Sequence, residues 1–488
     1  MKKMFLPGFL LVALVLVSAC ATDKEYNAKP NVLLLYMDDL RPQLGCYDNT
    51  QALSPNIDAL ASNGITFTNA YCNVAVCGAS RASMLTGMRP TKNRFRNYNT
   101  FVQEDTPEAI TLPQLFKNNG YTTISNGKIY HHLDDRISDW DEVWRPYAFE
   151  KNPEGLAPTD WWQSLWRDYM LPENIEVYKT TDRGPAFESA DVNDTAYIDG
   201  LMTQKVIRDL VKLKKEDKPF FLTAGFISPH LPFNAPSHHW DKYSRDSIQQ
   251  PYNNFIPENA PLLSISQSNE LRQYTSIPPK GEQVSDSTAI SLIHGYYATV
   301  SYVDVLIGHI LSKLKELELD KNTIVILVSD HGYNLQEHTQ WAKWTSHRTS
   351  MQVPLIISSP FLKHKHITDA LVELVDIYPT LAELCGLPVP ENQLEGASLL
   401  QILNGKDLKG KDHVFINNAN AYTVKTSKYC YTEFINPKND KTIARTLYDH
   451  QSDPDENVNV AEDIAYKEVV VHMHGILHTA YEKNVYGK

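Results

Sequence analysis

Three apolar runs, each followed by polar side chains, constrain the fold of this chain more than any other feature of its sequence. Residues 32–37 and 324–328 are apolar without interruption, and a third run lies within 218–230. Runs of this kind are typical of strands that are buried on both faces of a parallel sheet. Segments with a helical pattern alternate with them, for example at 54–64 and 198–216. The alternation predicts an α/β fold in which helices sandwich a large, mostly parallel sheet.

The polar residues that end these runs are of the types that bind metals and move protons. Asp38 and Asp39 follow the first run, Asp330 and His331 follow the second, and His230 ends the third. Ligands of open parallel sheets bind beyond the carboxyl ends of the strands. We therefore expect these side chains to share one crevice.

The aspartates of this crevice would repel one another, and some would become protonated, unless a cation lay between them. Oxygen ligands favour Ca²⁺, with Mg²⁺ as the second choice, and the nitrogen of His331 leaves Zn²⁺ or Mn²⁺ open. For a single Asp-Asp pair, a helix cap or a surface turn explains the sequence equally well. The second strand end with an acidic residue favours the metal site.

The charge balance argues against nucleic acid as a partner. The chain has 46 basic and 58 acidic residues, a formal net charge of −12, whereas binding to a phosphate backbone relies on an excess of Lys and Arg. An acidic protein that binds an anion must gather its cations at the site.

The N-terminus predicts export. Lys2 and Lys3 precede an apolar stretch over residues 5–17, and Val17-Ser18-Ala19-Cys20 resembles a bacterial lipobox. We expect residues 1–19 to be a lipoprotein signal peptide, with lipid on Cys20 and residues 20–28 as a tether. The product would be anchored to the outer membrane, in the periplasm or cell envelope, through its lipid alone. An ordinary signal peptide and a membrane helix are the alternatives, and no other segment looks long enough to span a membrane.

Six cysteines in an exported chain of this size do not make a disulfide scaffold. If Cys20 carries lipid, one bridge among the others is possible and the spacing does not fix it. Cys77 differs from them because it opens the motif Cys77-Gly78-Ala79-Ser80-Arg81 ahead of an expected helix.

This motif resembles the signature of the type I, formylglycine-dependent sulfatases of the alkaline phosphatase superfamily: Cys or Ser, any residue, Pro or Ala, any residue, Arg. Ala79 stands where Pro is commoner, which affects the choice of maturation system. Four further blocks resemble the family in the same order, at 54–71, 80–91, 120–132 and 447–461. Within the family, the stretches "DDLRPQLGCY" and "SDHGYNLQEHTQWAKW" are most similar to iduronate 2-sulfatases.

The resemblance implies that a formylglycine-generating enzyme oxidises Cys77 to 3-oxoalanine (formylglycine). One hydroxyl of the hydrated aldehyde would attack sulfur, and the second would then expel sulfate. The catalytic residues implied are Cys77, Arg81, Lys128, His131, His230 as general acid, and Lys343. The metal ligands implied are Asp38, Asp39, Asp330, His331 and the modified Cys77. His132 is a bystander in this scheme.

The sequence predicts a catalytic domain at 29–404 and a C-terminal subdomain at 411–488. In the subdomain it predicts antiparallel strands followed by a helix over 461–481. In two stretches of the first domain, 134–193 and 237–284, the apolar residues follow neither a helical nor a strand periodicity. We expect them to be loops or insertions over the carboxyl edge of the sheet, where loops usually carry specificity.

The resemblance implies exo-acting 2-O-desulfation of a uronic acid, saturated or unsaturated, in glycosaminoglycan oligosaccharides. Ser228, where iduronate 2-sulfatases carry Lys, and the loop at 94–101 depart from that group and leave the sugar open. The alternatives are another sulfated polysaccharide, an alkyl or choline sulfate, and a phosphonate monoester as substrate. A glycan-binding lipoprotein with an inactive site is a different class, which the intact residue set disfavours.

Overall fold

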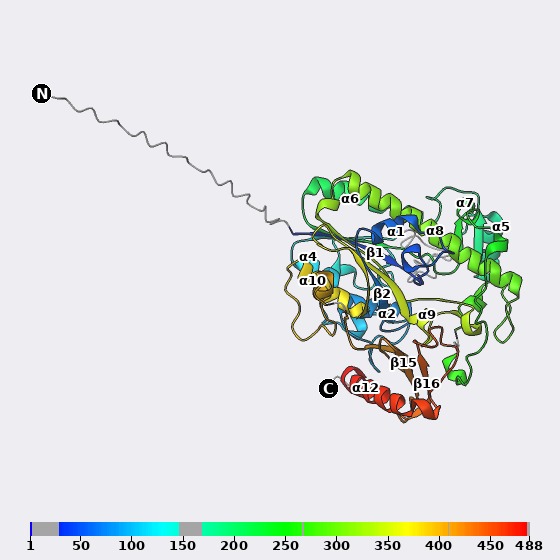
Figure 1. Cartoon of the computed structure of the whole chain (residues 1–488). Coiled ribbons are helices and arrows are strands. Elements are labelled where there is room, and N and C mark those ends of the chain that lie inside the picture. Colours follow the sequence, from blue (N-terminus) through cyan, green and yellow to red (C-terminus); the bar gives the residue numbers. More distant parts are fainter. Residues whose placement is uncertain (2–28, 146–167, 266–267, 408, 486–488) are drawn as a thin grey trace.

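The computed structural model describes Met1 and residues 29–145, 168–265, 268–407 and 409–485. The predicted signal peptide, Cys20 and the tether lie outside the described residues. An eight-stranded sheet in the order β12-β2-β11-β8-β1-β6-β3-β4 runs through the larger part of the molecule (Figure 1). Its strands are β1 Asn31–Met37, β2 Ile65–Tyr71, β3 Thr122–Gly127, β4 Glu142–Trp144, β6 Phe220–Gly225, β8 Thr323–Ser329, β11 Gln352–Ser358 and β12 His366–Glu373.

The three apolar runs form the centre of this sheet. β1 pairs in parallel with β6 on one side and with β8 on the other. β11 is the exception to the parallel arrangement, because it runs antiparallel to both β2 and β8. The α/β fold with a large, mostly parallel sheet is therefore confirmed.

Helices cover both faces of the sheet, since neighbouring residues of each buried strand point to opposite sides. Along β1, Leu34 and Tyr36 belong to one apolar core, whereas Leu33 and Leu35 belong to the other. The first core packs under α2 Cys77–Thr86, α4 Leu112–Asn118 and α10 Ile377–Leu384, and the second under α1 Pro55–Ala61, α6 Ile198–Glu216 and α8 Asp286–Glu316.

Helix α8 corrects one expectation from the sequence. It is long and apolar enough to cross a membrane by length and composition, although no such segment was expected beyond the N-terminus. In the structure, 78% of its most apolar window is buried inside the protein. Its apolar residues are accounted for by packing against α6, β7 and α1 within the second core.

The two stretches predicted as loops contain short regular elements. The described part of 134–193 includes helix α5 and strand β5, and β5 pairs in parallel with β7, so this stretch has regular structure of its own, as an insertion can. The remaining short elements are α3 Val102–Asp105, α5 Pro172–Thr181, α7 Ser237–Trp240, α9 Arg348–Met351, α11 Leu400–Leu403, β5 Phe187–Ala190, β7 Phe233–Pro236, β9 Asn334–Leu335 and β10 Trp341–Ala342.

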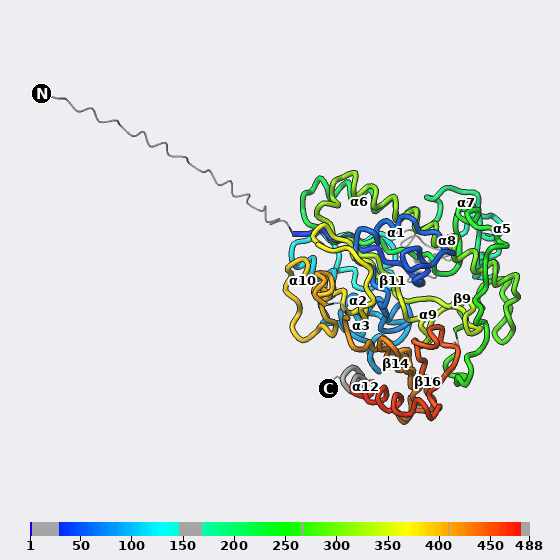
Figure 2. Tube along the Cα trace, viewed as in Figure 1, coloured from blue at the N-terminus to red at the C-terminus, as the bar shows by residue number. Residues whose placement is uncertain are grey.

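A second, four-stranded antiparallel sheet follows in the C-terminal part and carries the last helix, α12 (Figure 2). An apolar cluster between them includes Val424, Leu447 and Met473. The elements are β13 Val414–Asn418, β14 Ala421–Lys425, β15 Tyr429–Ile435, β16 Thr442–Asp449 and α12 Lys467–Val485. The strands agree with the sequence prediction, while α12 begins later than residue 461.

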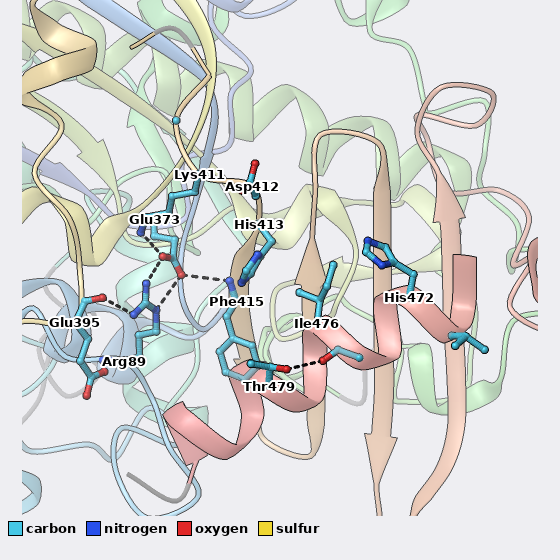
Figure 3. A pocket seen from close by; sticks show the side chains of 13 residues that line it. Arg89, Glu373, Glu395, Lys411, Asp412, His413, Phe415, His472, Ile476 and Thr479 are labelled. Atoms are coloured by element: carbon cyan, nitrogen blue, oxygen red, sulfur yellow. Dashed lines mark hydrogen bonds and ion pairs between the residues drawn. The ribbon is translucent and has the colours of Figure 1, made fainter. Parts of the chain in front are cut away.

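Buried ion pairs lie beside the junction of the two sheets. Glu373, at the end of β12, pairs with Arg89 and with Lys411 of the connecting segment, and Phe415 of β13 donates its backbone N–H to the same carboxylate. These groups line one side of a cavity of about 1010 Å³, and His472 of α12 lines another (Figure 3). The cavity is not lined by Asp38, Asp39, His230, Asp330 or His331, so we interpret the ion pairs as a structural junction.

Candidate active site

The parallel pairing of β1 and β8 places Asp38, Asp39, Asp330 and His331 at one edge of the sheet. The backbone N–H of Asp39 donates to Asp330 Oδ1 at 3.3 Å. Asp39 adopts a left-handed backbone conformation with φ 66°, which is uncommon for a residue other than glycine and is found at functional sites. All four side chains are buried, so the crevice predicted from the strand ends exists.

Cys77 is the first residue of α2, as the sequence predicted. Its side chain lies in the same cluster, because single ligand atoms of Asp38, Cys77, Asp330 and His331 all lie within 4.8 Å of one another. The start of α2 also contributes unpaired backbone N–H groups and the positive end of the helix dipole, both of which favour an anion.

Arg81, one turn into α2, holds this cluster together. Its Nε donates to Asp330 Oδ2 at 2.8 Å, and its two Nη atoms donate to the carbonyl oxygens of Lys128 and Met37 at 2.5 and 3.2 Å. The guanidinium carbon lies 4.4 Å from the centre of the Tyr36 ring. Arg81 is completely buried. Its positive charge therefore acts on the neighbouring carboxylates of Asp38 and Asp330 and not on solvent.

Lys128 and His131 follow β3 and lie on the Asp38 side. The ammonium of Lys128 contacts Asp38. Burial alone would raise the pKa of Asp38, but Lys128 and Arg81 outweigh that effect and hold it well below its usual range. Burial, together with the charge of Lys128, lowers the pKa of His131 to about 3. His131 is therefore neutral at any physiological pH.

Lys343 and His230 lie on the Asp39 side and share a third carboxylate, that of Glu270. Lys343 Nζ is 2.9 Å from Asp39 Oδ2 and 2.6 Å from Glu270 Oε1. His230 Nε2 is 2.8 Å from the same Glu270 oxygen, and His230 Nδ1 is 2.6 Å from the carbonyl oxygen of Leu231. Both acceptors lack protons of their own, so both imidazole nitrogens must donate and His230 carries a positive charge.

The residues at the strand ends fit a divalent cation. Asp38 Oδ1, Asp39 Oδ1 and His331 Nε2 are buried and have no hydrogen-bond partner among the described residues. His331 Nδ1 donates to the carbonyl oxygen of Gly332 at 2.9 Å, which leaves the lone pair of Nε2 free to bind a metal. Burial raises the pKa of Asp39 well above its ordinary value even with Lys343 beside it. A cation would relieve this crowding.

Comparison with known proteins agrees with this arrangement. The sulfatase family model matches residues 30–387, and the model described as N-sulphoglucosamine sulphohydrolase, C-terminal, matches residues 336–483. The chain belongs to the sulfatase family. It is a sulfuric ester hydrolase, and sulfatases generally use formylglycine and a divalent metal.

This sulfatase is similar to individual proteins in sequence and, at lower identity, to solved structures. Iduronate 2-sulfatase of Homo sapiens is 32% identical over 467 residues, which cover 82% of this chain and 80% of the human protein. The solved structure of BT1596, a 2-O GAG sulfatase, has a TM-score of 0.68 at 22% identity and covers 93% of this chain and 92% of that one. The phosphonate monoester hydrolase of Agrobacterium radiobacter has a TM-score of 0.73 at 20% identity, with 94% and 96% covered. At such identities the two structures establish the shared fold.

Every site residue predicted within the described part of the sulfatase lies in or beside this crevice, but Glu270 was missed. It comes from the irregular stretch 237–284, which was expected to cover the edge of the sheet and carries no motif around this position. Glu270 is marked as a site residue by its position between Lys343 and His230, and that position can be seen only in the folded structure. The disulfide that the sequence left possible is not formed among the described cysteines, since Cys46, Cys72, Cys77, Cys385 and Cys430 are all free.

Glu270 contacts Lys343 and His230, the two cations that the family resemblance assigns to the sulfate ester. Burial would raise its pKa, but Lys343 and His230 outweigh burial and hold the pKa well below its usual range, so the carboxylate is charged. We expect Glu270→Gln to remove this competing anion and to lower the inhibition constant for inorganic sulfate about 10-fold, roughly 1.4 kcal/mol. Inhibition kinetics measure it, with the exposed Glu282→Gln from the same stretch as control. An unchanged or higher constant for Glu270→Gln would show that Glu270 does not compete.

Proposed function

We propose that this sulfatase removes the 2-O-sulfate from a terminal uronic acid, saturated or unsaturated, of a glycosaminoglycan oligosaccharide. One observation carries the proposal most directly. Cys77 stands at the start of a helix among candidate metal ligands, with Lys128 on the Asp38 side of the crevice and Lys343 and His230 on the Asp39 side. The similarity to iduronate 2-sulfatase and to a 2-O GAG sulfatase supports the choice of sugar and position.

We assign the nucleophile to Cys77 after its oxidation to formylglycine, which supplies a hydrated aldehyde whose hydroxyl can attack sulfur. Asp38, Asp39, Asp330 and His331 would hold a divalent cation, for which we propose Ca²⁺ because most of these ligands are oxygens. Arg81 keeps Asp38 and Asp330 in place, since it lies 3.6 Å from one carboxylate and 2.8 Å from the other.

The remaining residues bind the sulfate and move protons. Lys128 and Lys343 carry ammonium groups on opposite sides of the crevice, and each can donate to a sulfate oxygen. His230 is protonated on both nitrogens and can give the Nε2 proton to the ester oxygen that leaves. His131 is neutral, and its Nδ1 has no partner among the described residues, so that atom can form a hydrogen bond with a sulfate oxygen or with the nucleophile.

Export as an outer-membrane lipoprotein remains part of the proposal. A sulfatase held in the bacterial cell envelope through lipid on Cys20 would meet sulfated oligosaccharides released outside the cytoplasm. It would require a formylglycine-generating enzyme that acts before or during export.

The test is a substrate panel on protein produced together with a formylglycine-generating enzyme. The panel contains disaccharides with a 2-O-sulfated uronate, disaccharides sulfated only on glucosamine, choline sulfate, and a phosphonate monoester. We expect kcat/KM to be highest for the 2-O-sulfated uronate, by about 100-fold or roughly 2.7 kcal/mol in transition-state binding. A preference for another sulfate ester would overturn the sugar assignment. A preference for the phosphonate would overturn the assignment to sulfated sugars as a whole.

A further inference from the structure

Two histidines of α12 and a buried glutamate of β15 form a cluster far along the chain from the active site. His474 Nδ1 lies 2.6 Å from Glu433 Oε1, and His478 Nε2 lies 3.2 Å from Glu433 Oε2. The two imidazole rings are 4.0 Å apart. One ligand atom from each of the three residues lies within 4.8 Å of the other two.

The carboxylate of Glu433 is buried and fixed in place facing the two histidines. Its side chain is 2% exposed, and the hydroxyls of Tyr431 and Thr442 donate to its two oxygens at 2.8 and 2.7 Å. Arg445, directly opposite on β16, pairs with Glu462 instead. In the described part of the chain, the ion-pair partners of Glu433 are the two histidines alone. A divalent cation held between the three side chains would place positive charge beside this buried carboxylate.

The two histidines have the spacing of a helical metal site. His474 and His478 are four residues apart, so they lie on one face of α12, one turn apart. Two imidazoles and one carboxylate are a ligand set that binds Zn²⁺ and related transition metals. The histidine side chains are 51% and 43% exposed, so a metal ion and a water molecule as fourth ligand can reach the cluster.

We propose that Glu433, His474 and His478 form a second metal site of this protein, specific for a divalent transition metal such as Zn²⁺ and separate from the catalytic cation. The ion would neutralise the buried carboxylate and fasten α12 to the sheet that it covers. The site differs from the catalytic one in its nitrogen-rich ligands, so Ca²⁺, which prefers six to eight oxygens, should not occupy it.

The experiment measures zinc bound per chain by equilibrium dialysis of the full protein against ZnCl₂, with Ca²⁺ in excess to fill the oxygen-rich site. The variants are the His474→Gln/His478→Gln double variant and, as matched control, His472→Gln on the same helix, whose side chain lines the cavity instead. We expect wild type and His472→Gln to bind one zinc ion more than the double variant. Each single variant at 474 or 478 should bind that ion at least about 10-fold more weakly, roughly 1.4 kcal/mol.

Cobalt gives an independent readout, because the visible absorption of Co²⁺ reports its ligands and their geometry. We expect the spectrum of a nitrogen-ligated, low-coordinate ion in wild type and in His472→Gln, and its loss in the double variant. Thermal unfolding shows whether the double variant is folded, which we expect because both histidines are half-exposed. Equal zinc stoichiometry and affinity in wild type and the double variant would overturn the proposal, as would a cobalt spectrum that survives both substitutions.

Discussion

Cys77→Ala is expected to abolish sulfate ester turnover, by about 10⁵- to 10⁶-fold, the loss seen when a nucleophile is removed from a catalytic unit. No neighbouring side chain can take its place, because the other groups of the crevice serve as cation ligands or proton carriers. The fold should survive, with a change in the free energy of unfolding of about 1 kcal/mol. Alanine fits the first position of α2, where Cys77 is 3% exposed. Steady-state kinetics and thermal unfolding measure the two effects.

Cys72→Ala is the matched control for this prediction. Cys72 is also a buried, free cysteine, and it comes just after the end of β2. Its removal costs packing but leaves the crevice intact, so turnover should stay near that of wild type. Cys77→Ser should be inactive unless the host oxidises serine. Mass spectrometry of the peptide around Cys77 completes the test, since an unmodified thiol in an enzyme working at full rate would contradict the assignment.

The central part of the fold and the principal site residues could be predicted from the sequence because their signals are local. An uninterrupted apolar run has one common explanation, a strand buried on both faces, and β1, β6 and β8 follow it. Once these strands are parallel neighbours, the side chains that end them must meet at one edge. The motif that begins at Cys77 reaches the same edge because it starts helix α2.

Glu270 could not be predicted because nothing near it in sequence marks it. It reaches Lys343 and His230 from an irregular stretch, and only tertiary structure brings them together. The same is true of Glu433, whose two histidine partners come from another element about 40 residues later.

The second large effect is expected for Arg81→Met, which should destabilise the protein by about 3–5 kcal/mol and remove activity. Methionine replaces the volume of the side chain but leaves Asp38 and Asp330 buried near each other without their shared cation. Breaking a buried ion pair by removing one partner has a cost of this size. The carbonyl oxygens of Lys128 and Met37 also lose their donor. Chemical denaturation measures the change, with the slope of unfolding compared to show that the unfolded states match.

Arg445→Met is the control, because the ion pair of Arg445 with Glu462 has a similar length, 2.6 Å, but lies at the surface. Its loss should cost no more than about 1 kcal/mol. Added Ca²⁺ tests whether the lost stability of Arg81→Met comes from lost charge compensation. If the defect of Arg81→Met is the lost charge compensation of Asp330 and Asp38, of which Asp38 keeps Lys128, a bound cation should restore part of the stability of the variant. Equal stability of Arg81→Met and wild type without Ca²⁺ would show that the two carboxylates do not depend on Arg81 for their charge balance.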